Sequence, residues 1–268
     1  MIKKIVAIGG GENGRILENG ETALYETEPM DREIVRLAGK ENPNFLFMVH
    51  SQDSLEIQES YFQTMKKIYG DKFGCNCQDL KSNELENIEK VKEKIAWADI
   101  IYEGGGDTEL MINLWKDNGF DRILYDAWNS GKVMCGISAG AVCWFRSCDS
   151  EKQTEIPTSV ECLNWFNTHF TPHCEETGRY EATRDNLKEN GLVGIMLSDC
   201  AALEIIDNQY RMIISDSNGH NIKKAYGLKV YWNNNEYREE KINISNKFED
   251  ISKLLSKERT IDDEEERE

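Results

Sequence analysis

A serine lies at the centre of Gly136-Ile137-Ser138-Ala139-Gly140, with glycines two positions before and two positions after it. An apolar run precedes this segment, and Ala139 to Val142 can open a helix. A sharp turn from strand to helix needs small neighbours if one hydroxyl is to be exposed without a steric clash. The segment therefore predicts that Ser138 is a nucleophile for acyl transfer. The N–H of Ala139 would then be one donor to the oxyanion.

A serine hydroxyl is a weak nucleophile, so it needs a histidine base and a carboxylate that orients the base. The chain contains four histidines. They are His50 at the end of an apolar run, His169 and His173 in one short segment, and His220 in a polar turn. Pattern alone does not decide between His169 and His173.

Two glycine triplets follow predicted strands, at residues 9–11 and 104–106. At the carboxyl end of a parallel sheet, glycines let backbone N–H groups approach an anion. The first triplet is not a convincing dinucleotide motif and lacks a Walker lysine-serine pair, so we interpret it as a tight turn. The second triplet is a candidate source of oxyanion donors, from Gly105 or Gly106.

The elements that must position these residues alternate between short apolar runs and longer amphipathic ones. Such alternation is typical of an α/β fold, in which helices cover a parallel sheet. Strands are predicted at 2–8, 45–49, 99–103 and 133–137, and helices at 31–40, 55–69, 84–98, 109–117 and 139–145. Closely spaced strands after residue 195 predict a β-rich closing part of the same domain. We expect one domain at 1–245 and an acidic helix or tail at 246–268.

Composition limits the function classes. The 268 residues carry a formal net charge of -17, which disfavours nucleic acid and anionic membranes as partners. No apolar run approaches the roughly 20 residues of a membrane span, and no signal peptide is evident. We therefore expect a cytoplasmic protein. Its eight cysteines would be reduced and mostly buried, because they show no spacing typical of metal ligands. No metal or cofactor is expected.

Three motifs together resemble the peptidase E family of aspartyl dipeptidases, which are relatives of cyanophycinase. The motifs are Gly104-Gly105-Gly106-Asp107-Thr108, Ser138-Ala139-Gly140-Ala141, and Leu163-Asn164-Trp165-Phe166 followed by Pro172-His173. The resemblance covers about residues 2–214. It implies a three-layer sandwich with a mostly parallel central sheet, similar to class I glutamine amidotransferases and flavodoxin-like folds.

The resemblance also implies roles for individual residues. His173 matches the family's base, whereas His169 falls where the family has glutamine. Asp199, after a late predicted strand, would be the orienting acid, and Glu155 is the alternative acid. Arg184 matches an arginine that grips the substrate carboxylate, with Arg179 as the alternative.

The resemblance implies a serine peptidase that cleaves short peptides, particularly dipeptides with an N-terminal aspartate. Asp107 and Thr108 would contribute to substrate binding. Two departures bear on the substrate pocket, because Ile137 stands where the family has tryptophan and Asp107 where it has asparagine. The alternatives are a cyanophycinase-like hydrolase or esterase and a non-catalytic ligand-binding member. A homodimer remains open.

Overall fold

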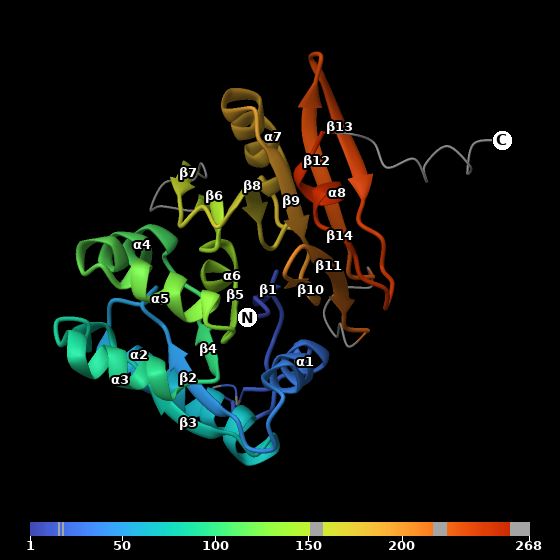
Figure 1. Cartoon of the computed structure of the whole chain (residues 1–268). Helices are drawn as coiled ribbons and strands as arrows, with labels where there is room; N and C mark the ends of the chain where they lie inside the picture. Colours follow the sequence, from blue (N-terminus) through green and yellow to red (C-terminus); the bar gives the residue numbers. More distant parts are fainter. Residues whose placement is uncertain (16, 18, 151–157, 217–223, 258–268) are drawn as a thin grey trace.

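The computed structural model describes residues 1–15, 17, 19–150, 158–216 and 224–257. Strands within these ranges form two sheets (Figure 1). The larger sheet has eight strands in the order β14-β11-β10-β1-β5-β4-β2-β3, and the smaller has six in the order β13-β12-β9-β8-β6-β7. Helices pack around the larger sheet, so the fold is mixed α/β.

The larger sheet combines a parallel block with an antiparallel edge. The parallel strands are β1 (Lys4–Ile8), β2 (Asn44–Met48), β3 (Asn76–Asp79), β4 (Ile100–Glu103) and β5 (Val133–Ile137). The antiparallel strands are β10 (Ala201–Ile206), β11 (Gln209–Ile214) and β14 (Glu249–Asp250). The central parallel strands are short apolar runs buried on both faces, as expected under helices.

The smaller sheet is also mixed. Strands β6 (Phe145–Ser150), β8 (Phe166–Thr171) and β9 (Val193–Leu197) are parallel to one another. Strands β7 (Thr158–Glu161), β12 (Gly227–Asn233) and β13 (Glu236–Lys241) pair with them or with each other in antiparallel fashion. The β13 strand is rich in charged residues, which suits an exposed sheet edge.

Helices cover both faces of the larger sheet. On one face lie α1 (Glu28–Ala38) and α2 (Leu55–Lys66), the latter continued by the π-helix η1 (Lys67–Lys72). On the other lie α3 (Ile88–Trp97), α4 (Thr108–Asp117) and α5 (Phe120–Asn129). The remaining elements are the 3₁₀-helix η2 (Ser82–Glu84), the short helices α6 (Ala139–Val142) and α8 (Ser252–Leu255), and α7 (Arg179–Asn190) beside the smaller sheet.

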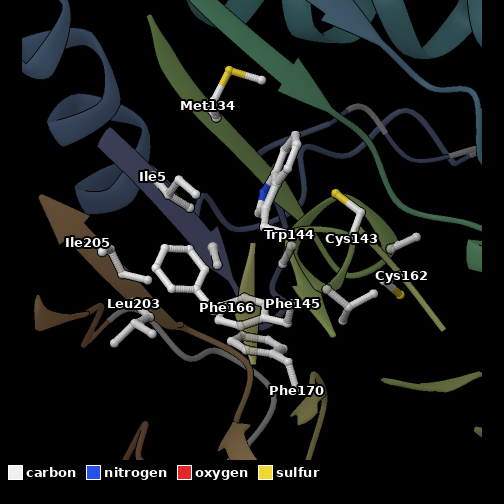
Figure 2. Packing of buried hydrophobic residues seen from close by; sticks show 14 of the residues in the cluster. Ile5, Met134, Cys143, Trp144, Phe145, Cys162, Phe166, Phe170, Leu203 and Ile205 are labelled. Atoms are coloured by element: carbon white, nitrogen blue, oxygen red, sulfur yellow. The ribbon is translucent and has the colours of Figure 1, made fainter. Parts of the chain in front are cut away.

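One hydrophobic cluster joins the two sheets. Figure 2 shows Ile5 and Leu203 of the larger sheet near Phe166 and Phe170 of the smaller one, with Trp144 in the same cluster. Because these side chains share one core, the carboxyl ends of β8 and β9 are brought to the end of β1. This packing positions the candidate site.

The predicted α/β class is confirmed, and β1, β2, β4 and β5 lie within two residues of their predicted positions. The expectation of one mostly parallel central sheet needs correction, because the sheet is mixed and a second sheet is present. The predicted helix at 139–145 ends at Val142, and β6 begins at Phe145. Strand β8 was not predicted because its Thr168, His169 and Thr171 are polar yet buried. The likeness to glutamine amidotransferases stays a prediction.

The expected boundary at residue 245 does not coincide with a break in the packing. Strand β14 pairs with β11, and Ile251 and Leu254 belong to the core cluster that joins both sheets. Residues 258–268 of the expected acidic tail lie outside the described residues.

Seven of the eight cysteines are buried, and Cys77 is partly exposed, in line with their expected role as small apolar residues. None of the described helices is long and apolar enough to cross a membrane.

Candidate active site

The turn at Ser138 packs closely against β4. Ser138 follows β5, has a φ of 54° and is partly exposed. A Cβ atom on Gly136 would lie 2.5 Å from the carbonyl oxygen of Glu103, and one on Gly140 would lie 2.0 Å from the same oxygen. Only glycine fits at either position. This steric limit is the physical reason for the small residues around the serine.

His173 and Asp199 follow the neighbouring parallel strands β8 and β9, and their side chains meet. Nδ1 of His173 lies 2.6 Å from Oδ1 of Asp199, with the two side chains 22% and 42% exposed. Burial lowers the pKa of His173, but the hydrogen bond and the charge of Asp199 outweigh it, so the pKa is raised above its ordinary value. With Nδ1 held by the carboxylate, Nε2 is the nitrogen left to exchange a proton.

The backbone after β1 is a common anchor for all three side chains. Three successive carbonyl oxygens each accept one backbone hydrogen bond. Ser138 N donates to Ile8 O at 3.0 Å, His173 N donates to Gly9 O at 3.2 Å, and Cys200 N donates to Gly10 O at 3.0 Å. Cys200 directly follows Asp199, and the three donors have φ values of 54°, 49° and 63°. Three sharp turns from two sheets are therefore fixed on three consecutive residues.

Gly10 is a part of the site whose role the sequence interpretation missed. A Cβ atom at this position would lie 1.9 Å from Oδ1 of Asp199 and 2.4 Å from Nδ1 of His173. Any side chain would push the histidine and aspartate apart. The tight-turn interpretation of the first glycine triplet explains its third residue, Gly11, whose φ is 126°. The need for glycine at position 10 depends on segments more than 160 residues away, so no local signal marks it.

The second glycine triplet lies beside the serine. A Cβ atom on Gly105 would be 3.4 Å from Cβ of Ser138 and 4.0 Å from its Oγ. Gly105 O accepts a hydrogen bond from Nε2 of Gln52 at 3.0 Å, which holds the loop. A Cβ atom on Gly106 would lie 2.4 Å from the carbonyl oxygen of Ser51. The peptide groups of Gly105 and Ala139 thus flank the Ser138 side chain.

No hydrogen bond joins Ser138 Oγ to His173 within the described part of the chain. Hydrogen bonds of this kind are often long before substrate binds and tighten only in the complex. The two backbones are nevertheless fixed on adjacent residues, Ile8 and Gly9.

Asp107 and Thr108, predicted as substrate contacts, start helix α4. The Asp107 carboxylate caps this helix by accepting a hydrogen bond from Leu110 N at 3.0 Å. Asp107 N donates to Ser51 O at 2.8 Å, and Thr108 is buried. These contacts hold the glycine loop against the loop after β2.

The two candidate arginines of α7 differ in position. Arg179 has a side chain only 11% exposed; its Nε lies 3.2 Å from Oε2 of Glu176, and its charge acts on the pKa of His173. Arg184 is 40% exposed and lies 3.1 Å from Oδ1 of Asp185. Of the two, Arg179 is therefore nearer the histidine, and both already have acidic partners.

His169 belongs to a second arrangement of serine, histidine and aspartate, which is fully buried. Its Nδ1 lies 2.9 Å from Oγ of Ser147, and its Nε2 lies 3.1 Å from Oδ2 of Asp149. Asp149 also accepts a hydrogen bond from Thr183 of α7 at 2.7 Å. Since His169 and Asp149 have fully buried side chains, this network fastens α7 to the smaller sheet and cannot reach a substrate.

His50 is also buried and fully engaged. Its Nε2 lies 2.8 Å from Leu80 O, and Nε1 of Trp115 donates to its Nδ1 at 2.9 Å. Burial lowers the pKa of His50 to about 4, which keeps the ring neutral.

His220 and the alternative acid Glu155 lie outside the described residues. Within the described ranges, no three His, Cys, Asp or Glu side chains form a metal-binding group.

Comparison with known proteins agrees with this architecture. Residues 16–213 match the model of peptidase family S51. The chain is 31% identical over 228 residues to the uncharacterized peptidase YgaJ of Bacillus subtilis (strain 168), which covers 84% of this chain and 91% of that protein.

Two solved structures share the fold. A peptidase from an acI-B1 Actinobacterium superposes with a TM-score of 0.65 at 18% identity, covering 93% of this chain and 97% of the other. A protein described as a peptidase E from Listeria monocytogenes EGD-e gives a TM-score of 0.58 at 18% identity, covering 80% and 99%. Since the family match spans most of its length, the chain belongs to peptidase family S51.

Proposed function

We propose that this protein is a serine peptidase that cleaves short peptides, including dipeptides, through an acyl-enzyme on Ser138. The observation that carries the proposal is the 2.6 Å contact between His173 Nδ1 and Asp199 Oδ1, anchored beside the strained turn of Ser138. Membership in family S51 supports a hydrolase of this class.

In the proposed reaction, Ser138 Oγ attacks the peptide carbonyl carbon while His173 Nε2 takes the hydroxyl proton. Asp199 holds the imidazole and stabilises its positive charge. The backbone N–H groups of Ala139 and of Gly105 or Gly106 are proposed to bind the oxyanion. The imidazolium then protonates the leaving amine, and water, deprotonated by His173, hydrolyses the serine ester.

A preference for an N-terminal aspartate was expected from the resemblance and needs a cation beside the acyl residue. Arg179 is the better placed arginine, but Glu176 and the carbonyl oxygen of Asp149 already engage it. Arg184 pairs with Asp185. We therefore propose peptidase activity without an aspartate requirement, and a substrate panel decides between the two.

Covalent labelling tests the nucleophile. We expect a fluorophosphonate to modify Ser138 and Ser138→Ala to abolish both labelling and peptide hydrolysis. Ser147→Ala is the matched control, because Ser147 lies beside a histidine and an aspartate but is buried. It should still be labelled at Ser138. Modification mapped to another serine, or labelling that survives in Ser138→Ala, would refute the proposal.

Hydrolysis assays then test the acyl group. Short α-peptides should be cleaved faster than β-linked aspartyl-arginine and simple esters. Faster turnover of β-aspartyl-arginine would instead support a cyanophycinase-like hydrolase. A protein that binds these compounds without turnover or labelling would be a ligand-binding member of the family.

A further inference from the structure

A cavity of about 430 Å³ lies between helix α2 and the loop that follows β1. Gly11 and Ile137 line it, and these residues neighbour Gly10 and Ser138 of the candidate site. The ring of Tyr61, another lining residue, lies against the glycine loop, since a Cβ atom on Gly104 would be 2.9 Å from its Cε1. The cavity lining thus adjoins the turn of Ser138 and the glycine loop, and Ser138, His173 and Asp199 lie outside it.

The cavity lies on one face of the larger sheet, and β8, the strand that precedes His173, packs against the other face. Tyr102 and Ile137, which line the cavity, belong to the cluster under α1 and α2. His173 follows β8, whose Phe166 and Phe170 belong to the cluster on the other face. In the proposed reaction the base must protonate the leaving amine. The leaving group therefore occupies the imidazole side, and the side chain of the acyl residue is directed to the cavity.

The cavity floor offers a ligand no free charged atom. Its buried lining residues are Met65, Tyr102 and Asp31. Both oxygens of Asp31 are engaged by hydroxyl groups: Tyr69 donates to Oδ1 at 2.7 Å, and Thr27 and Tyr25 donate to Oδ2 at 2.8 and 3.0 Å. The carboxyl group thus fastens α1 and its neighbours, and it offers no free oxygen to a substrate cation.

The exposed part of the cavity does not supply a cation for aspartate either. Arg15 is bound by Glu12 through both carboxylate oxygens, with Nε 3.0 Å from Oε2 and Nη2 3.1 Å from Oε1. A substrate aspartate would have to compete with Glu12 for this guanidinium, and Glu12 and Asp31 both place a carboxyl group on the same lining. The aromatic rings of Tyr61 and Tyr102 and the thioether of Met65 line the cavity, and these groups favour an uncharged substrate side chain.

We propose that this cavity receives the side chain of the acyl residue and selects a large uncharged one, aromatic or long aliphatic. The inference rests on the proposed function and names the substrate class of the same site. It departs from the aspartate preference expected from the resemblance. The arginines singled out by that resemblance lie on α7, beside the smaller sheet and on the imidazole side.

Dipeptides of the form X-Leu, with X as Phe, Met, Gly, Asn or Asp, test the selectivity. We expect kcat/KM for Phe-Leu and Met-Leu to exceed that for Asp-Leu by at least about tenfold. Asn-Leu separates charge from size, because asparagine has the shape of aspartate without its charge. If Asp-Leu is the best substrate, the inference is overturned.

Filling the cavity tests its location. Thr64→Phe, on the lining face of α2, should reduce the ratio of kcat/KM for Phe-Leu to that for Gly-Leu by at least about tenfold. Ser60→Phe, one turn earlier on the same lining face, should reduce the ratio as well and guards against a folding defect in the first variant. Gln63→Phe is the matched control, because Gln63 is exposed on the same helix outside the lining. It should leave the ratio unchanged.

The results distinguish the two proposals. If Ser138 is labelled and peptides are cleaved, but neither filled variant changes the ratio, the cavity inference alone fails. If Ser138 is not labelled and no dipeptide is cleaved, both proposals fail.

Discussion

At the residue scale, His173 is subject to two opposing influences. Its ring is largely buried, which favours the neutral form, yet its Nδ1 lies 2.6 Å from a carboxylate, which favours the charged form. The second influence prevails and raises the pKa of His173. Glu175 in turn holds the acid, because its Oε1 accepts a hydrogen bond from Asp199 N at 2.8 Å.

The pH dependence of activity should report this balance. A base must be neutral, so kcat/KM should rise with pH through a pKa above the ordinary histidine value of about 6.5. Asp199→Asn removes the negative charge beside His173 and leaves the ring buried, so the pKa of His173 should fall. The acidic limb of the kcat/KM profile should therefore move to lower pH. The kcat should fall by about 10³- to 10⁴-fold, because the imidazolium loses its stabilising partner.

The measurement is a kcat/KM profile from pH 5 to 9 for both proteins. Asp117→Asn, at the exposed end of α4, is the control and should leave the profile unchanged. An acidic limb at the same pH in Asp199→Asn would show that Asp199 does not set the basicity of His173.

Two sets of serine, histidine and aspartate occur in this chain, and residue type does not separate them. The set at Ser147, His169 and Asp149 is buried, whereas Ser138, His173 and Asp199 are accessible. Accessibility depends on which strand ends meet at the molecular surface. Of the two histidines, His173 is the accessible one, and its role as the base stays a prediction.

At the scale of elements, β4 supports the turn at Ser138 from beneath. Its last residue, Glu103, is fully buried, and its Oε1 accepts a hydrogen bond from Ser51 N at 3.2 Å. Its Oε2 has no hydrogen-bond partner in the described structure. Burial raises the pKa of Glu103 well above its ordinary value, so the folded protein keeps a proton on this carboxyl group to higher pH than the unfolded chain does.

Glu103→Gln should therefore stabilise the protein at pH 8. The folded state holds a proton that the unfolded chain releases above about pH 4.3, so stability from this group is present below that pH and is lost as pH rises. Relative to wild type, the variant should gain free energy of unfolding at pH 8. The gain should shrink toward pH 5.

Urea unfolding at the two pH values measures the difference. Glu93→Gln, exposed on α3, should change the free energy of unfolding by less than about 0.5 kcal/mol at both. A loss of stability in Glu103→Gln that is equal at pH 5 and pH 8 would mean that Glu103 is ionised in the folded protein.

At the scale of the whole molecule, the two sheets share a core, and the chain returns to it near residue 250. Leu254 of α8 is 2% exposed in the cluster that joins both sheets. The candidate site depends on this arrangement, because its histidine and aspartate come from one sheet and its serine from the other. The sheets should therefore unfold together.

Leu254→Ala tests this coupling. We expect a loss of about 2 to 5 kcal/mol in free energy of unfolding, from lost burial and the cavity left behind. Far-ultraviolet circular dichroism and tryptophan fluorescence should follow one transition. Ser252→Ala, exposed on the same short helix, should change stability by less than about 0.5 kcal/mol. Equal stability of Leu254→Ala and wild type would mean that α8 is not part of the folding unit.

The sequence by itself determined the features that depend on local pattern. Apolar runs predicted β1, β2, β4 and β5, and the small residues around Ser138 predicted its turn, because strand burial and tight turns impose requirements on neighbouring residues. The family membership was likewise recognisable from short motifs and is confirmed by the match over residues 16–213.

Tertiary structure alone decided the features that join distant segments. The sequence pattern does not predict strand β8, because its buried Thr168 and His169 are polar. Their hydrogen-bond partners, Val193 and Ser147, come from other strands. Gly10 must be glycine only because His173 and Asp199 lie against it. The cavity likewise exists only where α2 meets the loop after β1. Such requirements are steric and nonlocal, so they appear once the chain is folded.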